Sequence, residues 1–337
     1  MPKEVQHLSL RDLDLNLLRQ ASEATGLLQS WDIDLWIDNM LDGDEDPVIA
    51  ILLILLPILT RLSYSNFLSF PPGLRYALAI ITDYSQPYRA LSRLREVQCT
   101  CADVEDNIDY GEFEVIRAFA SLPHIRSITS DCIGTYQNDN LVHQSRPPRS
   151  NIKVLNLTNS AIDPKSLSEF LNTTHRLECF VYTPCDPNHN PECFDPFWIR
   201  TGLQSNAMYT LQSLTLLPNG HRRMFMGSLV ELRALKVLET DLGLLLGDPT
   251  ISVHKICMVL PLSIETVRLH VDKATDAPQY QPLMCDVKDS VASFPYVSDF
   301  TLGGTPRIDT IVPSPGLLIL ELKDLGVSFH FESLSDD

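Results

Sequence analysis

Residues 152–171 read IKVLNLTNSAIDPKSLSEFL, and the fold of the chain is decided by this stretch. Ile152, Leu155 and Leu157 form the pattern L-x-x-L-x-L, whose alternate side chains point to one face of a short strand. The Asp-Pro pair at 163–164 offers an N-cap followed by proline at the first helical position. Three apolar residues at helical spacing come next: Leu167, Phe170 and Leu171. We therefore predict a strand, a turn and a short helix, each with one apolar face.

The hydrophobic triplet recurs along nearly the whole chain when Ile, Val, Phe, Tyr or Cys is accepted in place of Leu. The eleven copies begin at Val5, Leu59, Leu94, Ile125, Ile152, Leu177, Leu211, Leu235, Ile264, Val297 and Leu317. From Leu62 to Leu320 their central residues are on average about 29 residues apart, at the upper end of the range for leucine-rich repeats. Such units bury their apolar faces by stacking on one another. We therefore predict an α/β leucine-rich-repeat solenoid, an irregular horseshoe with a parallel concave sheet and with helices and loops on the convex side.

The repeats predict one domain over residues 1–337, interrupted at three places. The period is broken at 15–46, at the proline-rich segment 185–198 and at 273–290, where we expect insertions. In repeat arrays such insertions form loops along one face. Two further helices are predicted, over 110–119 and 250–260.

Composition excludes several classes of partner. The 337 residues are 44% hydrophobic and 20% charged, as in a folded protein. Forty-three acidic and 26 basic residues give a net charge of −17, which disfavours nucleic acid and anionic membranes. The apolar run at 48–59 contains Pro57 and is too short to cross a bilayer, so we expect a buried helix there. The N-terminal residues do not resemble a secretory signal, so we expect an intracellular protein, cytoplasmic or nuclear, with its eight cysteines as interior thiols.

Candidate chemistry is confined to the 185–198 segment. Cys185, His189 and Cys193 are spaced four residues apart and could contribute to a metal site. Structural zinc needs four ligands, and no second pair lies nearby, so we favour a structural cysteine beside a loop histidine. No catalytic sequence motif occurs, and we expect neither a cofactor nor an enzyme. A metal-dependent or hydrolytic enzyme using this loop, and a structural remnant without a partner, are the two alternatives.

Strand alternation predicts which side chains line the concave sheet, because residues beside the inward apolar positions point outward. The predicted partner-binding residues are Arg11, Arg61, Glu96, Asn156, Glu239, Asp241, Arg268, His270, Asp299 and Glu321. The N-terminal part of this row is more basic and the C-terminal part more acidic. A partner with a matching basic patch would fit the acidic part, although a solvated polar face explains any single residue equally well.

The chain resembles the irregular leucine-rich-repeat proteins of filamentous fungi, many of which carry an F-box. The segments that match are VQHLSLRDLDL at 5–15, VIAILLILLPILTRLSYS at 48–65, IKVLNLTNSAI at 152–162 and LQSLTLL at 211–217. The resemblance implies a non-enzymatic scaffold for protein–protein interaction. An F-box would imply docking to the Skp adaptor of a cullin ubiquitin ligase, with the repeats recognising the substrate. No L-P-x-E-[IL] opening is found, so the ligase role is expected by analogy alone.

Overall fold

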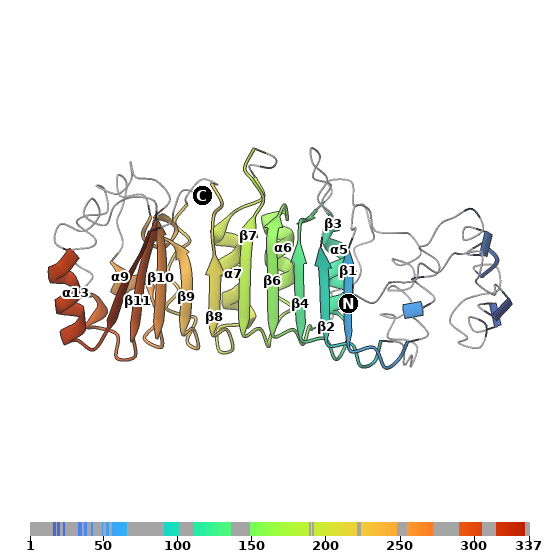
Figure 1. Ribbon diagram of the computed structural model, residues 1–337, viewed down its shortest axis with the longest axis horizontal. Coiled ribbons are helices and arrows are strands. Elements are labelled where there is room, and N and C mark those ends of the chain that lie inside the picture. The colour runs from blue at the N-terminus through green and yellow to red at the C-terminus, as the bar shows by residue number, and fades with distance from the viewer. Residues whose placement is uncertain are drawn as a thin grey trace, which may run out of the picture.

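A ten-stranded parallel sheet forms the centre of the computed structural model (Figure 1). The structure describes residues 56–65, 91–100, 111–135, 149–188, 192–220, 224–247, 255–271, 290–304 and 315–333, together with residue 190 and scattered positions between 16 and 53. The chain is an α/β protein, and its sheet is open, with β1 and β12 at the two edges. The ten strands lie in the sheet in the order in which they occur along the chain, and of the described strands only β3 and β5 are left out of it.

The sheet strands are β1 (Arg61–Ser65), β2 (Glu96–Thr100), β4 (Ser127–Asp131), β6 (Val154–Ser160), β7 (Cys179–Pro184), β8 (Ser213–Leu216), β9 (Val237–Asp241), β10 (Thr266–Val271), β11 (Asp299–Gly304) and β12 (Ser328–Ser333). A separate parallel pair is formed by β3 (Gly111–Glu112) and β5 (Ile133–Gly134). The helices are α5 (Phe113–Ala120), α6 (Pro164–Leu171), α7 (Pro196–Asn206), α8 (Leu242–Leu246), α9 (Ile256–Val259) and α13 (Pro315–Asp324).

The register of the sheet confirms nine of the predicted triplets. Their central residues are partners across successive strands: Leu62, Val97, Ile128, Leu155, Phe180, Leu214, Leu238, Val267 and Phe300. Even the weak copy at Ile125, with Ser130 in its third place, forms strand β4. The triplet that begins at Val5 lies outside the described residues.

The last predicted triplet, at Leu317, is wrong. That segment is helix α13, and the tenth strand is β12, where Phe329 pairs in register with Phe300. A short apolar run is compatible with either a helix or a strand, so leucine spacing alone did not distinguish them. The β12 triplet was missed because its first position is Gly326, which has a φ of 78° and ends the helix.

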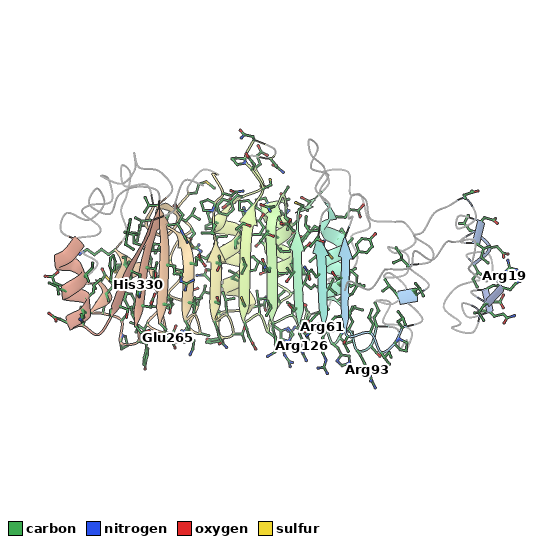
Figure 2. All side chains as sticks on the ribbon, viewed as in Figure 1. Arg19, Arg61, Arg93, Arg126, Glu265 and His330 are labelled. Atoms are coloured by element: carbon green, nitrogen blue, oxygen red, sulfur yellow. The ribbon has the colours of Figure 1, made fainter. Side chains whose placement is uncertain are left out.

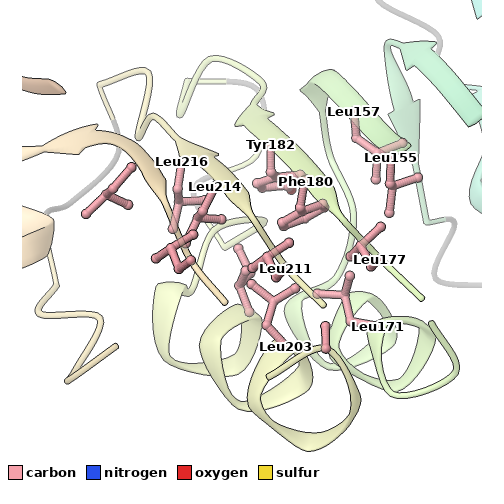
Figure 3. Packing of buried hydrophobic residues seen from close by; sticks show 14 of the residues in the cluster. Leu155, Leu157, Leu171, Leu177, Phe180, Tyr182, Leu203, Leu211, Leu214 and Leu216 are labelled. Atoms are coloured by element: carbon pink, nitrogen blue, oxygen red, sulfur yellow. The ribbon is translucent and has the colours of Figure 1, made fainter. Parts of the chain in front are cut away.

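The core lies between the sheet and helices α5, α6 and α7, which are grouped on one face of the sheet (Figure 1). Figure 3 shows Leu155, Phe180 and Leu214 from successive strands packing towards Leu171 of α6 and Leu203 of α7. All five side chains are almost completely buried. The buried side chains of successive strands and helices form one continuous core. Burial of one such side chain stabilises the fold by about 1.5–3 kcal/mol.

Local signals place the helices. The carboxylate of Asp163 accepts the Ser166 N–H at 2.8 Å, and Pro164 opens α6, as predicted. Helix α5 begins three residues later than the predicted 110–119 helix and ends one residue after it. Helix α9 occupies the end of the 250–260 segment, whose residues 250–254 lie outside the described part.

Of the three predicted insertions, only the 185–198 segment lies largely within the described residues. The 185–198 segment is a loop only as far as Asp195, because Pro196 begins helix α7. Residues 273–289 and most of 15–46 lie outside the described residues. Near the apolar run at 48–59, Leu53 is helical and buried whereas Leu52 is exposed. Among the described residues, no helix has the length and apolar character needed to cross a bilayer.

Candidate functional site

The sheet face opposite α5, α6 and α7 carries the polar side chains of the strands, and we call it the open face. One register row across it consists of Ser63, Gln98, Thr129, Asn156, Val181, Thr215, Glu239, Arg268, Thr301 and His330. In β4, β7 and β8 these positions are half-buried and alternate with fully buried ones. The alternation predicted from the triplets is therefore present.

The central cluster of the open face is built around Glu239. Its Oε1 lies 3.1 Å from Nε2 of His270, and Thr215 donates its hydroxyl hydrogen to Oε2 at 3.5 Å. The hydrogen bond from His270 is the largest cause that lowers the pKa of Glu239, and the charge of Arg268 acts in the same direction. The two paired side chains are only 22% and 28% exposed, so the carboxylate is held in a defined position.

Other predicted residues also meet across neighbouring strands. Arg61 Nε is 2.8 Å from Glu96 Oε2 at the first strand pair, where both side chains are largely exposed. At the other end of the sheet, Asp299 Oδ2 is 3.6 Å from Nε2 of His330, a residue of β12 that the triplets did not predict. Asn156 is in the middle of the row, and its enclosed Oδ1 has no hydrogen-bond partner among the described residues.

Two predicted binding residues are not on the open face. Asp241 is 1% exposed, and its Oδ1 accepts the backbone N–H groups of Gly243 and Leu244 at the start of α8. The prediction failed because β9 ends at this residue and alternation no longer applies. Glu321 is the other, because the Leu317 segment predicted as a strand is helix α13. Arg11 lies outside the described residues.

A second polar cluster, which sequence reasoning missed, lies at the ends of β4 and β6. Asp131 Oδ1 accepts hydrogen bonds from the Thr158 hydroxyl at 2.6 Å and from the Asn159 amide at 2.9 Å. Asn159 and Cys132, which directly follows β4, both have positive φ angles, which are uncommon for residues with side chains. The available signal was the polar Asp-Cys pair that directly follows the weak triplet at Ile125.

Two of the three candidate metal ligands, Cys185 and Cys193, lie in the segment before α7. The Sγ atoms of Cys185 and Cys193 are 3.5 Å apart, and both residues are buried beside Ala161. His189 lies outside the described residues. The carboxylate of Asp195 accepts the Phe197 N–H, so it caps α7. Within the described ranges, no group of three or more His, Cys, Asp or Glu side chains is placed to hold a metal ion.

Comparison of the sequence with protein-family models and with curated proteins gives no match. The class of protein is therefore defined by fold and surface alone. It is an α/β protein with an open ten-stranded parallel sheet, with α5, α6 and α7 on one face.

Proposed function

We propose that this protein is a leucine-rich-repeat solenoid that serves as a non-enzymatic scaffold and binds a protein partner through its open face. The observation that carries this proposal is the unbroken register row from Ser63 to His330, to which ten consecutive strands contribute one residue each. Stacked repeats of this kind produce extended surfaces that suit protein ligands.

The dimensions of the open face support a protein ligand. Ten strands spaced about 4.8 Å apart extend about 43 Å, and five residues of strand extend about 16 Å. The product is roughly 700 Å², close to the roughly 800 Å² that each partner buries in a standard protein–protein interface. A small molecule would occupy only a fraction of this surface.

The Glu239 cluster is the part of the open face best prepared for recognition. Its carboxylate is already held by His270 and Thr215, so little side-chain freedom remains to be lost on binding. Arg268 is on the same strand as His270, two residues away. The cluster therefore suits a partner that offers a basic group to Glu239 and an acidic group to Arg268.

The cellular role that we propose is substrate recognition in an SCF-type ubiquitin ligase. It is supported only by the resemblance to F-box leucine-rich-repeat proteins. Recovery of the Skp adaptor and a cullin with the tagged protein from its native cell would support it, whereas a stable complex that lacks both would contradict it.

The binding proposal is tested by capture of partners with a tagged protein, followed by mass spectrometry. We expect the double variant Glu239→Ala/Arg268→Ala to lose at least nine-tenths of the captured partner. A matched control is Glu321→Ala/Lys323→Ala, which also removes one acid and one base but lies on α13. Undiminished capture by a folded Glu239→Ala/Arg268→Ala protein would overturn the proposal.

A further inference from the structure

A second row of side chains lies at the start of the strands. Immediately before each strand of the sheet from β2 to β11, one residue donates its backbone N–H to the carbonyl of the equivalent residue one strand earlier, at distances of 2.7–2.9 Å, and the first of these carbonyls is that of Thr60 before β1. We call these residues the edge row, and they are Thr60, Arg95, Arg126, Lys153, Glu178, Gln212, Lys236, Glu265 and Ser298. The backbone ladder holds each side chain beside that of the next strand.

The charges of the edge row are balanced in one half and unbalanced in the other. Lys153 pairs with Glu178 at 2.5 Å, and Lys236 pairs with Glu265 at 2.8 Å. Before β2 and β4 the row instead has two consecutive arginines, Arg95 and Arg126. Their neighbours in the row are Thr60 on one side and Lys153 on the other, so the row supplies no acid to this end.

A pocket of about 390 Å³ lies at this unbalanced end, and we call it the edge pocket. It is lined by Thr60, Ser92, Arg93, Arg95 and His124, and no carboxylate is among these residues. In the part of the chain that the structure describes, neither arginine of the lining takes part in an ion pair. Figure 2 shows the labelled Arg61, Arg93 and Arg126 along the same edge of the sheet.

This concentration of cations is opposite in sign to the chain as a whole, whose net charge is −17. Guanidinium groups present several N–H donors in a planar fork that matches carboxylate and phosphate oxygens. The net negative charge of the protein repels a long polyanion. In addition, the run of basic residues in the edge row ends at Glu178, whose side chain is acidic. The edge pocket therefore suits a short anionic group rather than a nucleic acid strand.

We propose that the edge pocket binds a short acidic segment of a protein partner, with Arg93 and Arg95 contacting its carboxylates. This rests on the proposed scaffold function for the class of partner but uses a different surface. The open face would contact the body of the partner, and the edge pocket would fix one of its acidic loops or tails.

The probe for this proposal is a fluorescein-labelled hexaglutamate peptide, and its binding is followed by fluorescence anisotropy. We expect saturable binding that weakens as salt is added. The variant Arg93→Ala/Arg95→Ala should weaken it at least tenfold. The matched control Arg233→Ala/Lys236→Ala removes two positive charges from the same sheet edge before β9, and it should change binding less than twofold.

Two further measurements separate the possible failures. Glu239→Ala/Arg268→Ala should bind the peptide like the original protein, because neither residue lines the edge pocket. Undiminished partner capture by this variant together with intact peptide binding would overturn the open-face function and leave the edge pocket standing. Thermal unfolding followed by circular dichroism verifies that each variant is folded. Three results would overturn the proposal: absence of saturable peptide binding, equal loss of binding in Arg93→Ala/Arg95→Ala and in Arg233→Ala/Lys236→Ala, or tighter binding of a hexathymidine oligonucleotide through Arg93 and Arg95.

Discussion

His270 Nε2 lies 3.1 Å from Glu239 Oε1, across the boundary between strands β10 and β9. The two residues are 31 positions apart in the sequence and come together only because their strands are neighbours in the sheet. This contact is the main reason that the pKa of Glu239 is lowered. It links the chemistry of the open face directly to the stacking of the strands.

Replacement of His270 by alanine should raise the pKa of Glu239 towards its ordinary value of 4.5. A carboxylate with a lowered pKa in the folded state stabilises the fold above its ordinary pKa, and this contribution is lost as pH falls through the folded value. The His270→Ala variant should therefore lose less stability between neutral and acidic pH. Carbon-13 NMR titration of the carboxyl groups measures the shift directly. His330→Ala is the control, and an unchanged Glu239 pKa in His270→Ala would contradict the assignment.

Gly202→Ala should destabilise the fold, because a Cβ at this position would lie 2.9 Å from the Ser168 carbonyl oxygen and 3.0 Å from Leu171 Cβ. Helix propensity alone would favour alanine by up to about 1 kcal/mol. Overpacking between α6 and α7 costs about 1–3 kcal/mol, so the net effect should be a loss of stability. Urea unfolding measures it. Ser205→Ala, on the exposed side of α7, should stay within about 0.5 kcal/mol of the original protein.

Gly326→Ala should also destabilise the fold, but for a different reason. Its N–H bonds the Lys323 carbonyl and the Val327 N–H bonds the Leu322 carbonyl, which together form a Schellman ending of α13. No atom lies within 4 Å of a Cβ at this position, so the cost comes only from the φ of 78°. We expect about 1–2 kcal/mol for alanine and less for asparagine. Equal stability of the alanine and glycine proteins in urea would contradict this account.

Oxidised glutathione should join Cys185 and Cys193 in a disulfide, because their Sγ atoms are already 3.5 Å apart. The two thiols would lose their hydrogens while glutathione disulfide is reduced to two glutathione molecules. The reaction should be slow, since the hydrogen bond with the Cys185 thiol and, after it, burial raise the pKa of Cys193. Peptide mapping by mass spectrometry identifies the bond. Cys99, whose pKa is raised to about 12 by burial, should stay unmodified in the folded protein. Glutathione attached to Cys185 without a Cys185–Cys193 disulfide would contradict the closeness of the two Sγ atoms.

Several features of the site could not be predicted from sequence. Asp241 was expected on the open face, although an aspartate directly before an apolar helix is also an N-cap signal. Asp131 and Asn159 are paired only because β4 and β6 are neighbours. The edge pocket likewise combines residues 60, 92, 93, 95 and 124, which no local pattern connects.

Local sequence patterns were sufficient to locate nine strands and to align their residues, because the apolar triplet is a local signal that each strand carries independently. A local pattern also located the capped start of α6 at Asp163. Three features became apparent only in the folded protein: β12 completes the sheet, Asp241 is buried, and Glu239 contacts His270. These outcomes depend on contacts between residues far apart in the chain, which exist only after the strands are hydrogen-bonded side by side.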